Sequence, residues 1–181
     1  MHPSLFRSAS ELLVHYARHH RDQRNIATHL IGVPMIVFGL AVLLARATVW
    51  PGDPGLSLSW AIWGLATLWY VSRGHLLIGL TVSLFNAALV ALAHLPAGSS
   101  ISQWLSWGLG CFAAGWTLQW LGHYYEGRKP ALVEDLSGLL VGPMFVSAEL
   151  LFSMGLAEPM RREIEGRAGP TVLRDLAHPV G

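Results

Sequence analysis

Long uncharged apolar stretches alternate with short polar segments along most of this chain. Residues 26–45 contain no Asp, Glu, Lys or Arg and are about as long as a helix that crosses a bilayer. Residues 56–72 and 74–95 are also uncharged and are separated only by Arg73, which predicts a tight helical hairpin. Residues 103–121 form a fourth such stretch. The pattern predicts an all-α integral membrane protein with at least four transmembrane helices.

A fifth apolar segment, residues 136–157, is compatible with more than one topology. Pro143 removes a helix hydrogen bond, and Glu149 would lie near mid-membrane if the segment crossed. Crossing would also place the arginines of the following tail outside, against the tendency of basic residues to stay in the cytoplasm. We therefore expect a C-terminal membrane-embedded or re-entrant helical segment that returns to the cytoplasmic side.

Basic residues in the short loops indicate the orientation of the helices. They precede the first span, occupy the turn between the second and third, and follow the fourth, and such positions favour the cytoplasm. No repeat or linker divides the chain, so we expect one membrane domain over 1–181, with a core at about 16–157 and polar tails at 1–15 and 158–181. The expected membrane is the cytoplasmic (inner) membrane in a bacterium or the endoplasmic reticulum in a eukaryote.

Composition supports insertion into lipid and excludes several functions. Only 13% of the 181 residues are charged, whereas an average soluble domain has about 25%. The net charge of +1 gives no basic surface of the kind that binds nucleic acid, so we expect no nucleic-acid partner. The single cysteine, Cys111, excludes an intrachain disulfide and an all-cysteine zinc site.

Histidines and acidic residues gather in two polar blocks that flank the predicted spans. Four of the nine histidines lie within residues 14–29, and another begins the polar segment after the fourth span. Four crossings would bring both blocks to the same membrane face, which we expect to be cytoplasmic. The residues that would share this face are His20, Asn25, His29, His123, Glu126, Arg128, Lys129 and Glu134.

The spacing within these blocks is suited to metal binding. His29 lies four residues after Asn25, and Glu126 lies three after His123, so each pair shares a helix face. His20 lies nine residues before His29, so both can face one site only if the chain turns between them. Imidazoles and carboxylates without thiolates suit non-haem iron, and less distinctively zinc or manganese.

Other polar residues permit two interpretations. Arg128 and Lys129 could capture a substrate carboxylate or could serve only as topology signals. Glu149 is costly within an apolar segment unless it is paired, and it is therefore a functional candidate. His75 and His94 lie at predicted span ends without a carboxylate neighbour, which favours a structural role.

From about Tyr16 to Leu156 the chain resembles the membrane 2-hydroxy fatty acid dioxygenase family. The first matching block carries the family's H-x4-N-x3-H signature and a following proline, at His20, Asn25, His29 and Pro34. The second block carries Gln119, Gly122, His123, Glu126, Pro130, Pro143 and Glu149.

The resemblance implies an iron(II)-dependent dioxygenase that uses O2 to convert a long-chain 2-hydroxy fatty acid of the membrane into the acid one carbon shorter. It implies that the catalytic metal ligands are His20, His29, His123 and Glu126. Substrate contacts are then expected from Asn25, Arg128 and Lys129, and support of the ligands from Asn25, Gln119, Glu134 and Glu149.

Three other functions compete with this interpretation. A two-iron membrane desaturase or hydroxylase would need more closely spaced histidine pairs than the sequence contains. A zinc-dependent membrane hydrolase would use a similar set of ligands. A non-enzymatic lipid-binding or scaffold membrane protein would explain the apolar helices, but it gives no reason for two histidine-rich blocks on one face.

Overall fold

The computed structural model describes residues 6–50, 52, 55–128 and 138–176. Within these residues it has seven α-helices and two isolated β-bridges, so the predicted all-α fold is confirmed. The helices are α1 (Ala9–Ala17), α2 (Gln23–Leu44), α3 (Leu58–Val71), α4 (Leu76–Ala97), α5 (Ile101–Glu126), α7 (Gly138–Ser153) and α8 (Glu158–Ala168).

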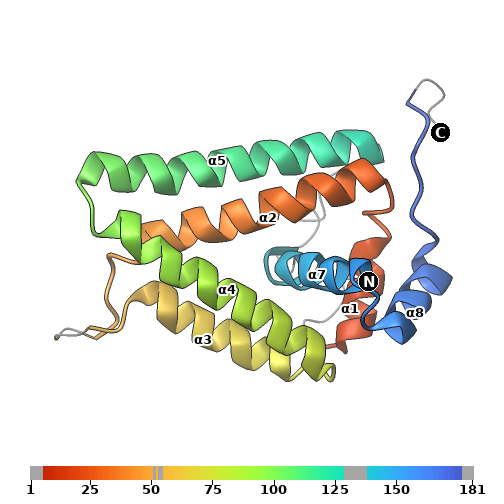
Figure 1. Cartoon of the computed structure of the whole chain (residues 1–181), viewed down its shortest axis with the longest axis horizontal. Helices are drawn as coiled ribbons and strands as arrows, with labels where there is room; N and C mark the ends of the chain where they lie inside the picture. The colour runs from red at the N-terminus through yellow and green to blue at the C-terminus, as the bar shows by residue number, and fades with distance from the viewer. Residues whose placement is uncertain (1–5, 51, 53–54, 129–137, 177–181) are drawn as a thin grey trace.

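Two pairs of long helices form the body of the molecule. Figure 1 shows α2 beside α5 along the long axis, with α3 and α4 as a second pair. Helix α7 lies between the pairs at one end, and α1 and α8 close that end. The N-terminal end of α2 and the C-terminal end of α5 meet there as well, so this end brings together both histidine blocks.

Glycines let α2 and α5 approach closely. A Cβ atom added to Gly32 would lie 2.9 Å from the carbonyl oxygen of Gly115, and one added to Gly39 would lie 2.6 Å from that of Gly108. A Cβ at Gly122 would overlap the side chain of Asn25. These contacts recur every seven residues on both helices, which keeps one seam of each helix facing the other. This spacing is readable in the sequence, although no contact between these helices was predicted from it.

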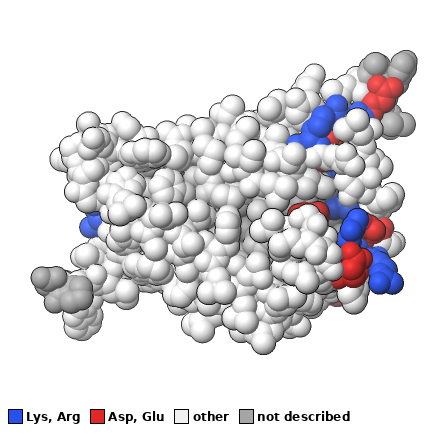
Figure 2. Space-filling view, viewed as in Figure 1, with Lys and Arg blue, Asp and Glu red and all other residues white. Residues whose placement is uncertain are grey.

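Charged side chains gather at the end of the molecule that α1 and α8 close. Figure 2 shows blue and red atoms there and an almost uncharged surface along the rest of the visible face. Within the described residues, α2 and α4 are the two helices long and apolar enough to cross a membrane, and α3 is apolar but has only 14 residues. All four predicted spans are helical, but the expected count of at least four crossings is not confirmed.

The C-terminal helices are sharply bent relative to each other. Helices α7 and α8 reach the required apolar length only together, and they meet at an angle of 116°, as in a broken span or a re-entrant loop. Re-entry into the membrane stays a prediction. Residues 9–15 were expected to belong to a polar tail, but they lie in α1 and are largely buried. Leu12 and Leu13 of this helix belong to the core that packs against α7 and α8.

Candidate metal centre

A turn between α1 and α2 places His20 opposite His29. Helix α1 ends at Ala17 and α2 begins at Gln23. Asp22 is the N-cap of α2, and its side chain accepts a hydrogen bond from the Arg24 amide at 2.8 Å. This is the change of direction that the nine-residue spacing of the two histidines requires. His20 therefore comes from the turn and His29 from the first part of α2.

Three buried histidines converge at this end of the molecule. His20, His29 and His123 each offer a ring nitrogen, and these three atoms lie within 4.8 Å of one another. The exposed fractions of the residues are 0%, 1% and 5%. His123 reaches the group from the last turn of α5. The close glycine contacts between α2 and α5 hold that helix against the part of α2 that carries His29.

Hydrogen bonds orient two of the rings. Nδ1 of His20 lies 2.7 Å from the carbonyl oxygen of Tyr16, and Nδ1 of His29 lies 2.9 Å from that of Asn25. A carbonyl oxygen can only accept, so both Nδ1 atoms carry the proton and donate. In the neutral rings both Nε2 atoms are then left with a lone pair.

These two lone pairs face each other at short range. Nε2 of His20 lies 3.0 Å from Nε2 of His29, which is repulsive unless a proton or a metal ion lies between them. Nitrogen ligands at about 2.1 Å from a metal, at angles near 90–110°, are about 3.0–3.4 Å apart. Nδ1 of His123 is buried without a hydrogen-bond partner among the described residues. The donor set therefore fits a metal ion.

Aromatic rings enclose His20. The ring of Tyr16 stacks on the His20 ring, with centroids 4.0 Å apart and planes 4° from parallel. The ring centroid of Phe145, on α7, lies 5.4 Å from that of His20. Burial, together with the neighbouring His29 and His123, holds the pKa of His20 well below its usual range. The ring is therefore neutral at neutral pH, the form in which imidazole binds metals.

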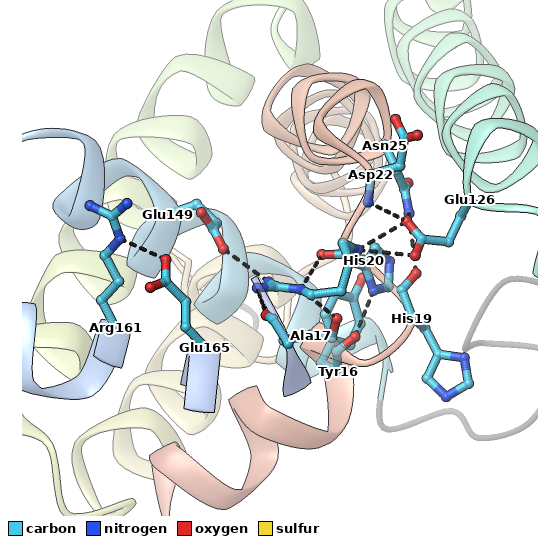
Figure 3. A network of polar contacts seen from close by, with 12 residues as sticks. Tyr16, Ala17, His19, His20, Asp22, Asn25, Glu126, Glu149, Arg161 and Glu165 are labelled. Atoms are coloured by element: carbon cyan, nitrogen blue, oxygen red, sulfur yellow. Dashed lines mark hydrogen bonds and ion pairs between the residues drawn. The ribbon is translucent and has the colours of Figure 1, made fainter. Parts of the chain in front are cut away.

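Glu126 contacts the turn that carries His20. Its carboxylate accepts hydrogen bonds from the amides of Arg21, at 3.0 and 3.1 Å, and Asp22, at 2.8 Å. It also accepts one from Nδ2 of Asn25 at 3.0 Å (Figure 3). The structure thus places Glu126 against the backbone of the turn, outside the three-histidine group. Its part as a metal ligand stays a prediction, while these contacts favour a positioning role.

Asn25 links the two histidine elements. Its Nδ2 donates to the carbonyl of His19 at 3.1 Å as well as to Glu126, and its own carbonyl accepts from His29. Asn25 is fully buried, and its side-chain oxygen has no hydrogen-bond partner among the described residues. The expected contact between Asn25 and substrate stays a prediction.

Glu149 of α7 faces Arg21, the residue that directly follows His20 in the chain. The carboxylate lies 3.6 Å from the guanidinium, which also donates to the carbonyls of Ala17, His20 and Gly169 (Figure 3). A pairing partner thus offsets the cost of a carboxylate in an apolar helix. Arg21 is one of the basic residues before the first predicted span, whose predicted role was only to mark the cytoplasmic side.

Arg128, one of the two predicted substrate cations, is not part of the histidine group. Arg128 is exposed and donates from Nη1 to the carbonyl of Arg18 at 2.8 Å. Lys129 and Glu134 lie outside the described residues, so their predicted roles stay predictions.

A largely apolar pocket of about 60 Å³ adjoins two of the histidines. Its walls come from α1, α2, α5 and α7, and its polar lining residues are Tyr16, His29, Gln119 and His123. Its apolar lining includes Val33, Ile36, Val37, Trp116, Leu139 and Pro143. The arrangement offers an apolar group a place beside two of the three potential metal ligands.

The segment that follows α8 runs back over the His20 turn. The amide of Val172 donates to the carbonyl of Arg21 at 2.8 Å, and the carbonyl of Val172 accepts from Gln23 at 2.9 Å. The amide of Arg174 donates to Asp22 at 2.9 Å. We call residues 169–176 the C-terminal strap. No pattern in the sequence indicated it, because the strap is held mostly by backbone atoms.

Two comparisons with known proteins identify the family of this chain. A family model described as "2-hydroxy-palmitic acid dioxygenase Mpo1-like" matches residues 6–154, which include all three histidines and end before the strap. The chain belongs to the Mpo1-like family. A relative in that family, the 2-hydroxy-palmitic acid dioxygenase MPO1 of Saccharomyces cerevisiae, is 30% identical over 155 residues, covering 83% of each chain. No solved structure matches the chain.

Proposed function

We propose that this protein is an iron(II)-dependent dioxygenase that shortens long-chain 2-hydroxy fatty acids by one carbon. The observation that carries the proposal is the buried group of His20, His29 and His123, at the polar end of an apolar pocket. The names of the family and of the yeast relative supply the class of substrate and reaction.

The three histidines would hold the metal through ring nitrogens. Histidine ligands with carboxylates nearby and no thiolate suit iron(II) in oxygenases. When bound, iron(II) would supply open coordination positions and the redox chemistry that activates O2. Glu126 would keep His20 in place by binding the backbone of its turn, and Tyr16 and Phe145 would keep bulk water from the ring.

The shape of the pocket suggests how the acyl chain of the substrate would be oriented. From His29, its α2 wall continues through Val33 and Ile36 to Val37, a distance of about 12 Å along the helix axis. An acyl chain can lie along this wall while its hydroxy-carboxylate group reaches the histidines. The apolar lining favours burial of the chain and keeps water from it.

The proposed reaction balances without an added reductant. A 2-hydroxy acid and O2 yield the acid one carbon shorter, CO2 and water. The bond between C1 and C2 breaks, C2 is oxidised to the new carboxyl carbon, and O2 is reduced. The enzyme would therefore need only the metal and its two substrates.

For the membrane arrangement, we propose that α2, α3, α4 and α5 all cross, with α7 and α8 as a re-entrant pair. The concentration of charged side chains at one end supports this, as does the absence of Asp, Glu, Lys and Arg from α5 before Glu126. The histidines would face the cytoplasm, from the inner membrane of a bacterium or the endoplasmic reticulum of a eukaryote. Reporters inserted at Gly74 and Gly98 should then lie on opposite sides of the membrane, and the same side for both would overturn the topology.

The activity can be tested with purified protein in detergent. The protein is loaded with iron(II) under argon and given 2-hydroxyhexadecanoate and then O2, and the products are identified by mass spectrometry. We expect pentadecanoate from the wild type and from His94→Ala, and more than tenfold less from His29→Ala. Folded, iron-loaded protein that forms no shortened acid would overturn the proposal. Bound zinc with ester hydrolysis would indicate a hydrolase instead.

A further inference from the structure

Gln119 carries a buried amide that the described residues leave without a partner. Only 6% of the residue is exposed, and no hydrogen bond reaches its Nε2 within the described part of the chain. Buried amide donors are almost always paired, because an unpaired donor loses its hydration without compensation. Within the described residues this donor therefore lacks an acceptor, which a bound ligand can supply.

The position of Gln119 shows where that group would lie. The residue is on α5, one turn before His123, and it lines the same pocket as His123 and His29. The facing helix leaves room for the amide at Gly32, where an added Cβ would lie 3.1 Å from Nε2. Gln119 thus lines the pocket together with two of the three potential metal ligands.

We propose that Gln119 binds the carboxylate of the 2-hydroxy acid through Nε2–H and so positions the head group beside the histidines. The inference rests on the proposed function, because the carboxylate is that of the proposed substrate. A carboxylate is a strong acceptor for an amide donor. A neutral donor also suits a site that would hold a metal cation, since it adds no like charge.

Arg128 is less well placed for this task. Its guanidinium is exposed and donates to the carbonyl of Arg18, and it lines a separate pocket with Asp22, Glu126 and Arg174. Capture of the carboxylate by Arg128 would draw the head group to that pocket. Gln119 lies on the wall that the acyl chain would follow.

The test compares two ligands that differ at the head group. Binding of 2-hydroxyhexadecanoate and of hexadecane-1,2-diol, which keeps the hydroxyl but lacks the carboxylate, is measured by tryptophan fluorescence without O2. Trp116 lines the pocket and can report on occupancy. For Gln119→Leu we expect about tenfold weaker binding of the acid, unchanged binding of the diol and an unchanged iron content. The control is Thr117→Ala, an exposed position on the same helix.

The outcomes separate the inference from the proposed function. Equal weakening for acid and diol in Gln119→Leu would show that the residue only packs, and the inference would fail. Loss of acid binding in Arg128→Ala but not in Gln119→Leu would overturn it as well. Wild-type protein that binds the acid more tightly than the diol but forms no shortened acid with O2 would refute the proposed function alone.

Discussion

His29, which is buried, and His94, which is half-buried, lie at opposite ends of the long helices. Both make the same local hydrogen bond through Nδ1. At the end away from the charges, Nδ1 of His94 lies 2.8 Å from the carbonyl of Val90, four residues earlier. His29 makes the same contact with Asn25, and each region stacks a histidine on an aromatic ring. Local sequence thus fixes Nδ1 in the same way at both ends.

The regions differ in what the second ring nitrogen meets. Nε2 of His94 lies 3.1 Å from the hydroxyl of Ser57, which can donate to it, so both nitrogens are satisfied. Nε2 of His29 instead meets the equivalent atom of His20 at 3.0 Å. A histidine becomes a potential ligand only where tertiary packing leaves its second nitrogen facing another lone pair.

The strongest test of this difference is to remove each histidine in turn. His20→Ala and His123→Ala should each lower iron affinity by more than about a hundredfold, because loss of a ligand costs more than loss of a residue that orients one. His94→Ala should keep the wild-type iron content. Elemental analysis after dialysis against a weak chelator measures both. Similar retention in all three variants would remove the distinction between the two ends.

Glu126→Gln tests whether Glu126 binds the metal itself or only holds the turn that carries His20. The amide keeps the size of the side chain but accepts the hydrogen bonds of the Arg21 and Asp22 amides more weakly. We expect about tenfold weaker iron binding, the effect typical of residues that orient ligands. A loss as complete as that of His123→Ala would instead show that Glu126 binds the metal directly.

The next effect concerns the helix seam that brings His123 to His29. A Cβ atom at Gly115 would lie 2.6 Å from the carbonyl of Gly32, whereas one at Gly110 would meet nothing within 4 Å. Gly115→Ala should therefore cost about 1–3 kcal/mol of stability, while Gly110→Ala should leave it equal or slightly higher. Thermal unfolding in detergent, followed by circular dichroism, compares the two. Equal melting temperatures would contradict the close approach of α2 and α5.

The sequence predicted much of this arrangement, because long apolar stretches and helix spacing are local signals. The four predicted segments are helices, and the turn between His20 and His29 follows from their spacing. The number of crossings did not follow, since α3 is only 14 residues long and α5, although longer, is not among the helices apolar enough to qualify as a span. The contacts of Glu126, the pairing of Arg21 with Glu149 and the strap depend on residues distant in the chain. Periodicity carries no information about such contacts.

The smallest expected effect concerns the strap. Hydrogen bonds from Arg24, and one from the Arg174 amide, hold the pKa of Asp22 at about 2, below its usual value of 3.8. A lowered folded-state pKa stabilises the protein above the unfolded value, and this contribution is lost as the pH falls from about 4 towards 2. Asp22→Asn should lower the melting temperature at about pH 4.5 but much less at about pH 2.5. Glu163→Gln, which removes an exposed ion pair on α8, should change neither by much. An equal loss for Asp22→Asn at both pH values would contradict the role of its charge.

The three-histidine metal centre is tested most directly by X-ray absorption spectroscopy at the iron edge of the reconstituted wild-type protein and of His123→Ala. The multiple-scattering signal of imidazole counts histidine ligands. We predict three imidazoles in the wild type, and two in whatever iron the variant retains, with the change confined to that count. An identical spectrum for the two proteins, or a wild-type spectrum with no imidazole contribution, would contradict a metal centre built from His20, His29 and His123.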